Sequence, residues 1–404
     1  MSSTVNRSAS STKIGDELIN KIQEPQQPTV SSIICRSITV KSSPTTMRMS
    51  PPATLRNWKF HKPLLAVGNA SGIIQIFNLT SGKLYRELSV HSYSVKGIEW
   101  IGLNAFISYA ESESFQGNDT NWELHVAELD TGRTVQLKGG RSSETSVIQS
   151  VKASHLRQYF IVIFKSQPFE IWDLDSLSLL KRVPRKFSGI VAAEWSPLYS
   201  KKIGTSQTIP ATEEQSSNRA AGPLRENFVV TNRLGELIHF SIAGSVVKEI
   251  SKIPPEANVN KAVTAIAWKS DHVVLGRNDG NFSVWDLGQK ESRTISTMRG
   301  PIKKIRFAPG RGNMKIMILF EDRVDVWDAK RLRLFSNVAS RSQFFKIEDA
   351  DWAASDRPVI LTSNGTVVVT DLEFKHFSTS NQEVGPYRTA ENATERNGEP
   401  CYLQ

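Results

Sequence analysis

Short apolar runs of five to seven residues, separated by Asn, Asp, Gly, Ser and Pro, recur along most of the chain. Runs of this length that end in turn residues are typical of β-strands, and helical periodicity is nearly absent. Pairs such as Ser71-Gly72, Asp279-Gly280 and Asn364-Gly365 follow several of the runs. Such pairs permit the positive φ angles that tight hairpin turns require. The pattern therefore predicts an all-β protein made of hairpin-linked strands.

A Trp-Asp dipeptide closes three of the predicted strands in the same sequence context. The dipeptides are Trp172-Asp173, Trp285-Asp286 and Trp327-Asp328, and residues 74–79 form a weaker copy. A second type of strand ends in an aromatic residue at Trp100, Trp195, Trp268, Phe307 and Trp352. Units of ~40–45 residues with four strands, the third closed by Trp-Asp, resemble the WD40 repeat of β-propellers. We expect the Trp and Asp residues of the three dipeptides to be structural.

The length of the repeating region predicts the number of blades. Residues 45–378, less a polar insert at 199–224, amount to 308 residues, or 44 for each of seven blades. We therefore expect a seven-bladed WD40-like β-propeller. Residues 1–44 should form a mostly disordered arm with a short helix near 14–22, and residues 379–404 a disordered tail, because both are poor in apolar residues.

The repeats are degenerate at their polar positions. His91 sits where a WD40 repeat places the histidine that bonds the Asp of a tight turn, but here the turn offers Asn69. We expect these tethers to be mostly missing, so that packing between blades carries the stability.

Four stretches, residues 63–68, 79–100, 151–159 and 302–310, carry a closer resemblance. They are similar to the second propeller of the WD repeat-containing protein 11 family, and the resemblance runs in order from about residue 45 to 375. It implies a cytosolic scaffold that acts in vesicle tethering between endosomes and the trans-Golgi network, with links to ciliary signalling. It also implies protein partners in a trafficking complex, a peripheral association with Golgi vesicles, and membrane contact that is only indirect.

The search for catalytic chemistry finds no candidate. The seven histidines never occur at metal-ligand spacing, and no nucleophile elbow, Walker loop or dinucleotide fingerprint is present. Two cysteines, Cys35 and Cys401, cannot form a disulfide framework, which favours a reducing compartment. No signal-peptide pattern or long apolar run is present either, so we expect neither secretion nor a membrane span. The sequence thus predicts a non-enzymatic chain without catalytic, cofactor or metal residues.

Charge adds one candidate interaction surface. The chain carries a formal charge of +10, and residues 252–341 alone hold 17 Lys and Arg against 9 Asp and Glu. We expect a patch for acidic protein segments formed by Lys303, Lys304, Arg306, Arg311, Lys330, Arg331 and Arg333. Two alternatives remain open: an ordinary solvated surface, and a propeller that binds nucleic acid or chromatin-associated acidic partners, for which the nucleus is the alternative location. Nucleic acid is disfavoured because the aromatic residues occupy apolar strand positions rather than interleaving with the cations.

Overall fold

The protein is described by a computed structural model. It describes residues 37–54, 57–112, 120–142, 147–165, 167–183, 189–197, 223–255, 261–340 and 346–374. Within these residues, no helix is both long enough and apolar enough to cross a membrane.

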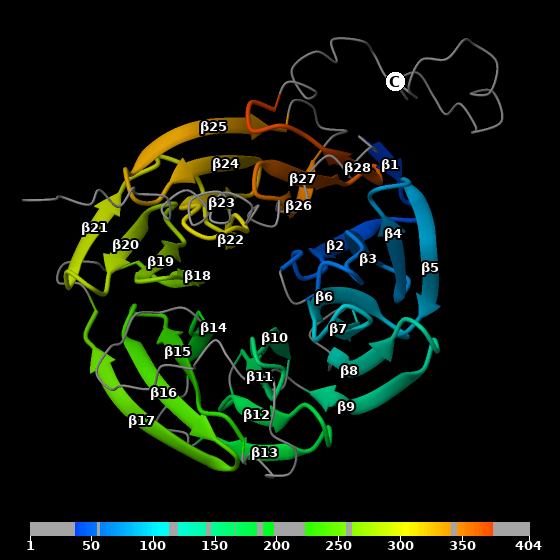
Figure 1. Cartoon of the computed structure of the whole chain (residues 1–404), viewed down its shortest axis with the longest axis horizontal. Coiled ribbons are helices and arrows are strands. Elements are labelled where there is room, and N and C mark those ends of the chain that lie inside the picture. Colours follow the sequence, from blue (N-terminus) through cyan, green and yellow to red (C-terminus); the bar gives the residue numbers. More distant parts are fainter. Residues whose placement is uncertain are drawn as a thin grey trace, which may run out of the picture.

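Seven four-stranded antiparallel sheets are arranged as blades around a central axis (Figure 1). In blades 1–6 the strands follow one another in chain order from the axis to the perimeter. This confirms the predicted all-β, seven-bladed propeller.

The strands of the first four blades are as follows: blade 1, β2 (Pro44–Met49), β3 (Leu64–Asn69), β4 (Ile73–Asn78) and β5 (Lys83–Ser89); blade 2, β6 (Ser94–Trp100), β7 (Ala105–Glu111), β8 (Thr120–Glu128) and β9 (Thr134–Ser142); blade 3, β10 (Ile148–Ala153), β11 (Tyr159–Phe164), β12 (Glu170–Asp173) and β13 (Leu179–Arg182); blade 4, β14 (Ile190–Trp195), β15 (Glu226–Asn232), β16 (Leu237–Ala243) and β17 (Val246–Ile253). The remaining strands are these: blade 5, β18 (Val263–Lys269), β19 (His272–Arg277), β20 (Phe282–Asp286) and β21 (Glu291–Ile295); blade 6, β22 (Lys304–Phe307), β23 (Lys315–Leu319), β24 (Arg323–Asp328) and β25 (Arg333–Ala339); blade 7, β26 (Ile347–Ala354), β27 (Arg357–Thr362), β28 (Thr366–Val369) and, from the other end of the chain, β1 (Ser37–Thr39).

The ring is closed by the N-terminal strand. β1 pairs antiparallel with β28, with Ile38 opposite Val367, and thereby supplies the outermost strand of blade 7. The backbone N–H of Val40 continues the contact by donating to the Gly365 carbonyl at 2.7 Å. The predicted domain boundary at residue 45 is therefore corrected: the propeller includes residues from Ser37, because the last blade needs a fourth strand. The short helix expected near residues 14–22 lies outside the described residues.

The hydrophobic core lies between the blades. Seven apolar clusters are present among the described residues, and each is shared by two neighbouring blades. The second strands β3 and β11 are buried along their whole length, whereas the outer strands β17 and β21 are mostly exposed. A blade therefore buries its faces only against its neighbours, as in other repeat proteins.

Glycines at two of the predicted tight turns are required by the backbone. Gly72 and Gly280 have φ angles of 82° and 81°, in the region that favours glycine. A Cβ atom at either position would also overlap a carbonyl oxygen of the connection between blades, that of His91 or Arg299 respectively. Each turn is thus packed closely against the chain that enters the next blade.

Most of the polar insert predicted at 199–224 lies outside the described residues, as does the tail predicted at 379–404. The insert falls between β14 and β15, the first and second strands of blade 4. Its last residue, Leu224, is held by Gln158: the Leu224 N–H donates to Oε1 at 2.8 Å, and Nε2 donates to the Leu224 carbonyl at 3.0 Å.

Candidate functional site

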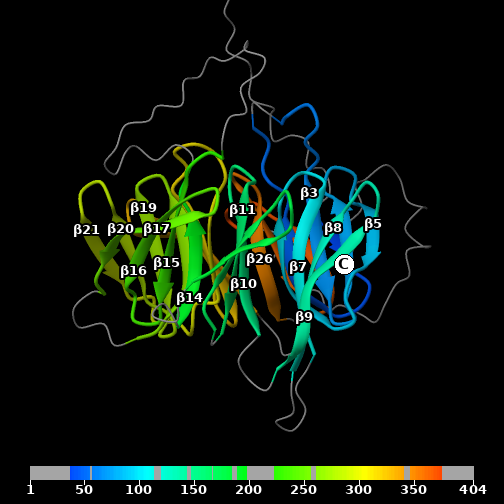
Figure 2. The ribbon, with the colours of Figure 1, turned by 90° about the horizontal axis from the view of Figure 1, so that it is seen from below.

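The antiparallel strand order gives the disc two different rims (Figure 2). Rim A carries the loops from the first to the second strand of each blade and the turns from the third to the fourth. Rim B carries the turns from the second to the third strand and the connections between blades. Any two loops that are one strand apart in sequence therefore lie on opposite rims.

The residues of the Trp-Asp dipeptides lie at or next to the ends of the third strands β12, β20 and β24. The Trp172 ring stacks on Phe160 at 5.7 Å, and the Trp327 ring meets Phe282 of the preceding blade edge-on at 5.3 Å. Trp285 is half-buried against the apolar cluster between blades 4 and 5. These indoles lie within the fold and do not form an exposed surface.

The aspartates of the dipeptides organise the turns on rim A. Asp173 accepts from the N–H and the hydroxyl of Ser176, both at 2.7 Å. Asp286 accepts from the N–H groups of Gly288 and Gln289 at 2.9 and 3.0 Å. Asp328 accepts in the same way from Lys330 and Arg331 at 3.0 and 2.9 Å. Each carboxylate satisfies the first backbone donors of its turn, a local bonding pattern common for Asp.

The seven cations of the predicted acidic-partner patch do not form one surface, which corrects that expectation. Lys303 lies on rim B and pairs with Glu321 at 3.3 Å. Lys304 pairs across to Asp349 of blade 7 at 2.7 Å, and Arg306 lies on the innermost strand of its blade. The reason is topological. Lys303 directly precedes β22, and Lys304 and Arg306 lie in it, whereas the other four cations follow the ends of β22 and β24 on rim A.

The four remaining cations do gather on rim A of blade 6. Arg311 lies in the loop between β22 and β23, and Lys330, Arg331 and Arg333 lie at the turn between β24 and β25. All four are exposed, and within the described part of the chain none of their side chains forms an ion pair. The turn of blade 7 beside them is attached by Asn313, whose Nδ2 donates to the Ser355 carbonyl at 2.8 Å. That turn also presents one exposed acid, Asp356. We call the four cations the rim A cluster.

A second charged feature was not found by the sequence reasoning. In each innermost strand, the relevant position is the one directly before the aromatic residue near its end, or before its final residue where that end has no aromatic residue. This position is charged in every blade except blade 5, and the sign of the charge alternates from blade to blade around the axis. In blade order the residues are Arg48, Glu99, Lys152, Glu194, Ala267, Arg306 and Asp351. In the sequence, this feature could have been recognised from the charged residue that directly precedes each of the aromatic residues Trp100, Trp195, Phe307 and Trp352.

Ion pairs join the members of this charged ring. Arg48 contacts Glu99 of blade 2 at 3.2 Å and Asp351 of blade 7 at 3.1 Å, and Lys152 contacts Glu194 of blade 4 at 2.8 Å. Each of these five side chains is less than one-fifth exposed. Charges so poorly hydrated are stable only when they are paired.

The pKa shifts follow from this pairing. Burial opposes the charge of Arg48, yet the attraction of Glu99 and Asp351 raises its pKa. Burial likewise disfavours ionised Asp351, but the charges of Arg48, Lys304 and Arg306 hold its pKa well below the usual range. Glu194 behaves similarly, because Lys152 and Arg306 outweigh burial and lower its pKa. Arg48, Asp351 and Glu194 are therefore charged at neutral pH.

Tryptophans on the innermost strands add a second link between blades. The indole N–H groups of Trp100, Trp195 and Trp352 each donate at 3.0 Å to a carbonyl of the preceding blade's innermost strand. Trp268 of blade 5 instead donates to Ser270 of its own blade at 2.9 Å. Blade 5 therefore departs from the pattern twice, at Ala267 and at Trp268.

His91 does not contact Asn69 in the way expected for a WD40 tether. Asn69 Oδ1 accepts from the N–H groups of Ser71 and Ile73 within its own turn, both at 2.9 Å. The His91 ring instead lies against blade 2, with Nε2 2.8 Å from Ser108 Oγ and Nδ1 3.2 Å from Glu123 Oε2. A polar tether is thus present, but it binds the next blade.

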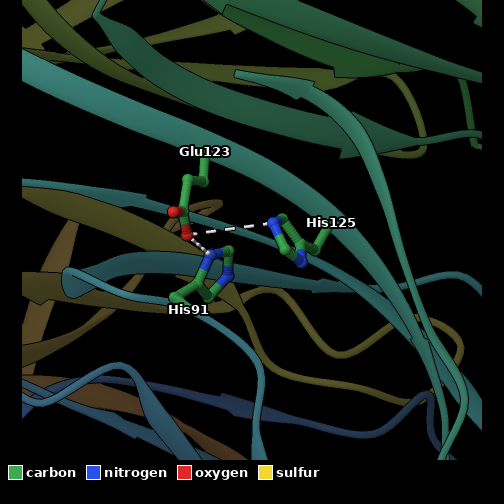
Figure 3. Close-up of side chains that lie close together, drawn as sticks. All are labelled: His91, Glu123 and His125. Atoms are coloured by element: carbon green, nitrogen blue, oxygen red, sulfur yellow. Dashed lines mark hydrogen bonds and ion pairs between the residues drawn. The ribbon is translucent and has the colours of Figure 1, made fainter. Parts of the chain in front are cut away.

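His125 lies beside this pair (Figure 3). Its Nε2 is 3.8 Å from Glu123 Oε2, and the two imidazole rings are 4.6 Å apart. Burial, together with the His125 ring, lowers the pKa of His91 to about 4, and burial also lowers the pKa of His125. The structure thus brings His91 against Glu123 and His125, although His91 precedes Glu123 by 32 positions in the sequence.

Comparison with known proteins gives a consistent result. The family model described as the WDR11 second beta-propeller matches residues 34–354. WD repeat-containing protein 11 of Mus musculus is 38% identical over 361 residues, and that of Danio rerio is 37% identical over 364. The matched parts cover 81% and 83% of this chain and 29% of each relative. The chain thus spans less than a third of the length of these relatives.

Proposed function

Because the chain belongs to the WD repeat-containing protein 11 family, as the family's second β-propeller, we propose that it is an interaction module of a cytosolic vesicle-trafficking scaffold. In this proposal it acts in tethering endosome-derived vesicles at the trans-Golgi network, with a link to ciliary signalling. Propellers of this kind serve as scaffolds for protein interaction, since the rigid ring presents two rims of loops. The activity is binding rather than turnover, and contact with the membrane is through protein partners.

The rim A cluster carries the more specific part of the proposal. Arg311, Lys330, Arg331 and Arg333 are exposed on one blade, whereas Lys303 and Lys304 have their charges compensated by Glu321 and Asp349. Uncompensated positive charge attracts acidic segments over the ~8 Å screening length at physiological salt. We therefore propose acidic segments of trafficking proteins as the ligands of rim A at blade 6.

The magnitude of each contact determines how the proposal must be tested. One exposed ion pair contributes only ~0.2–1 kcal/mol, so a single substitution should have little effect. Four simultaneous reversals, Arg311→Glu, Lys330→Glu, Arg331→Glu and Arg333→Glu, should abolish binding of a peptide with clustered Asp and Glu, measured by fluorescence anisotropy. Wild-type binding should weaken steeply as salt is raised.

The matched control reverses four cations on rim B: Lys41, Lys303, Arg323 and Lys346. It changes the net charge by the same amount and should leave the peptide affinity within a few-fold of wild type. Equal losses in both variants would show a general charge effect and would contradict a rim A site. Unchanged binding in the rim A variant would place the contact elsewhere.

Duplex DNA separates the proposal from the nucleic-acid alternative. Both ligands are expected to show a salt-dependent affinity, because both are anionic. If DNA binds more tightly than the acidic peptide at physiological salt, the alternative is favoured. Co-localisation of the tagged chain with a trans-Golgi marker tests the cellular part of the proposal, and a diffuse distribution would contradict it.

A further inference from the structure

We propose that His91, Glu123 and His125 form a binding site for a divalent transition-metal ion, with zinc as the expected ion. Glu123 and His125 are two residues apart on β8, so their side chains leave the same face of the strand. His91 comes from the connection between β5 and β6 and meets them from the side (Figure 3). The proposal is independent of the proposed function.

The donor atoms have nearly the separations that a metal ion needs. Tetrahedral zinc with bonds of ~2.0–2.1 Å places its ligand atoms about 3.3 Å apart. His91 Nδ1 lies 3.2 Å and His125 Nε2 lies 3.8 Å from Glu123 Oε2, and the three ligand atoms all lie within 4.8 Å of one another. Small rotations of these side chains would therefore bring the three ligand atoms to the separations expected around a tetrahedral zinc ion.

The buried ring nitrogens of His125 also support a bound ion at this position. Both of its ring nitrogens are buried, and neither has a hydrogen-bond partner among the described residues. A buried polar atom without a partner destabilises the folded chain, so such atoms are rare in folded proteins. A metal ion bound to Nε2 would satisfy one of them.

The surroundings hold the other two ligands in place. Ser108 Oγ contacts Nε2 of His91 at 2.8 Å, which leaves Nδ1 directed at Glu123. The Ser92 N–H donates to Glu123 Oε2 at 3.1 Å and fixes that carboxylate. Ligating histidines and carboxylates in metal sites typically have such supporting hydrogen bonds.

The ligand types favour zinc over the alkaline-earth ions. Two imidazoles and one carboxylate suit zinc, copper and nickel, whereas calcium and magnesium prefer sites made of oxygen atoms only. Three protein ligands also leave one position of a tetrahedral ion for a further ligand. The bound ion would join the connection between blades 1 and 2 to the third strand of blade 2 on the rim B side.

The test uses the purified full chain after removal of metals with a chelator. Titration with Zn²⁺ by calorimetry, and with Co²⁺ followed by its visible absorption, should give one ion per chain and a tetrahedral Co²⁺ spectrum. Zinc should also raise the melting temperature. Absence of saturable one-to-one binding would overturn the proposal.

Variants then locate the site. Glu123→Gln and His125→Asn should weaken binding at least ~100-fold, and Ser108→Ala should weaken it by ~10-fold or more through loss of support for His91. The matched control is His272→Asn: His272 lies 3.7 Å from Asp286 without a second imidazole in that pair, and it should bind as wild type. Loss of binding in the control, or full binding in His125→Asn with an unchanged melting curve, would contradict the assignment.

Discussion

The interface between blades 7 and 1 and the interface between blades 4 and 5 are built differently. At the first, the backbone N–H groups of Met47 and Met49 donate to the carboxylates of Asp349 and Asp351 at 2.9 and 3.2 Å, and Arg48 pairs with Asp351. At the second, the charged position is occupied by Ala267, and the indole of Trp268 bonds within its own blade.

Apolar packing is common to both interfaces. Between blades 4 and 5 it includes Val191, Leu237 and Val273, with Trp285 at its edge. At the closure, Ile38 and Val40 from the N-terminal segment join the cluster. The comparison teaches that the closure combines apolar packing with directional polar contacts, as the interfaces between blades 1 and 2 and between blades 3 and 4 also do, whereas the interface between blades 4 and 5 relies mainly on apolar packing. A closure made of segments remote in sequence needs contacts that fix its register.

The largest expected effect is at the closing strand. Ile38→Asp would place an unpaired charge among apolar side chains, because Ile38 is 7% exposed, and should lower the free energy of unfolding by about 3–5 kcal/mol. Thr39→Asp, one residue away and exposed, should change it by less than about 0.5 kcal/mol. Urea denaturation measures both. Equal, small effects would show that β1 contributes little to closure.

A smaller loss is expected from Asp351→Asn. It removes one of the two carboxylate charges that pair with Arg48 and replaces an acceptor for the Met49 N–H, so we expect a loss of about 3 kcal/mol at neutral pH. The pKa of Asp351 lies below its usual range in the folded chain, so its contribution is present above about pH 4 and is lost as the pH falls further. The difference between wild type and variant should therefore shrink in acid. A difference independent of pH would refute an ionic origin.

The smallest of the three effects is expected between blades 4 and 5. Trp285→Ala should cost about 2–3 kcal/mol, since the half-buried indole contributes packing but its buried N–H has no hydrogen-bond partner in the described residues. Because no charge is removed, the loss should be the same at pH 4 and pH 7. Thermal melts at both pH values check this. A melting temperature equal to that of wild type would show that Trp285 does not stabilise the interface between blades 4 and 5.

Much of the fold could be predicted from local sequence. The dipeptides at Trp172, Trp285 and Trp327 lie at the third strands of their blades, as expected from their shared context. Strand alternation and turn residues are encoded within a few positions, so they can be read without knowledge of distant contacts. The boundary at residue 45 was wrong because β1 has only three residues and pairs with a strand at the other end of the chain.

The sites were less predictable. Lys303, Lys304 and Arg306 looked like part of one basic patch, but β22 directs them to rim B and to the axis, where acids compensate two of them. The cluster of His91, Glu123 and His125 gave no sequence signal, since its members are separated by up to 34 positions and come from different segments.

The sequence by itself determined the strands, their inward faces, the tight turns and the number of blades, because each depends on periodicity and on the conformational preferences of neighbouring residues. Only the tertiary structure decided which side chains meet. Arg48 and Asp351 are 303 positions apart, and the closure of the ring makes them neighbours. The same closure recruits β1 into blade 7. Blade packing likewise sets His91 beside β8, and it pairs Lys303 and Lys304 with acids while the four cations of the rim A cluster have no ion pair among the described residues, since burial and pairing are properties of the folded ring and not of any local segment.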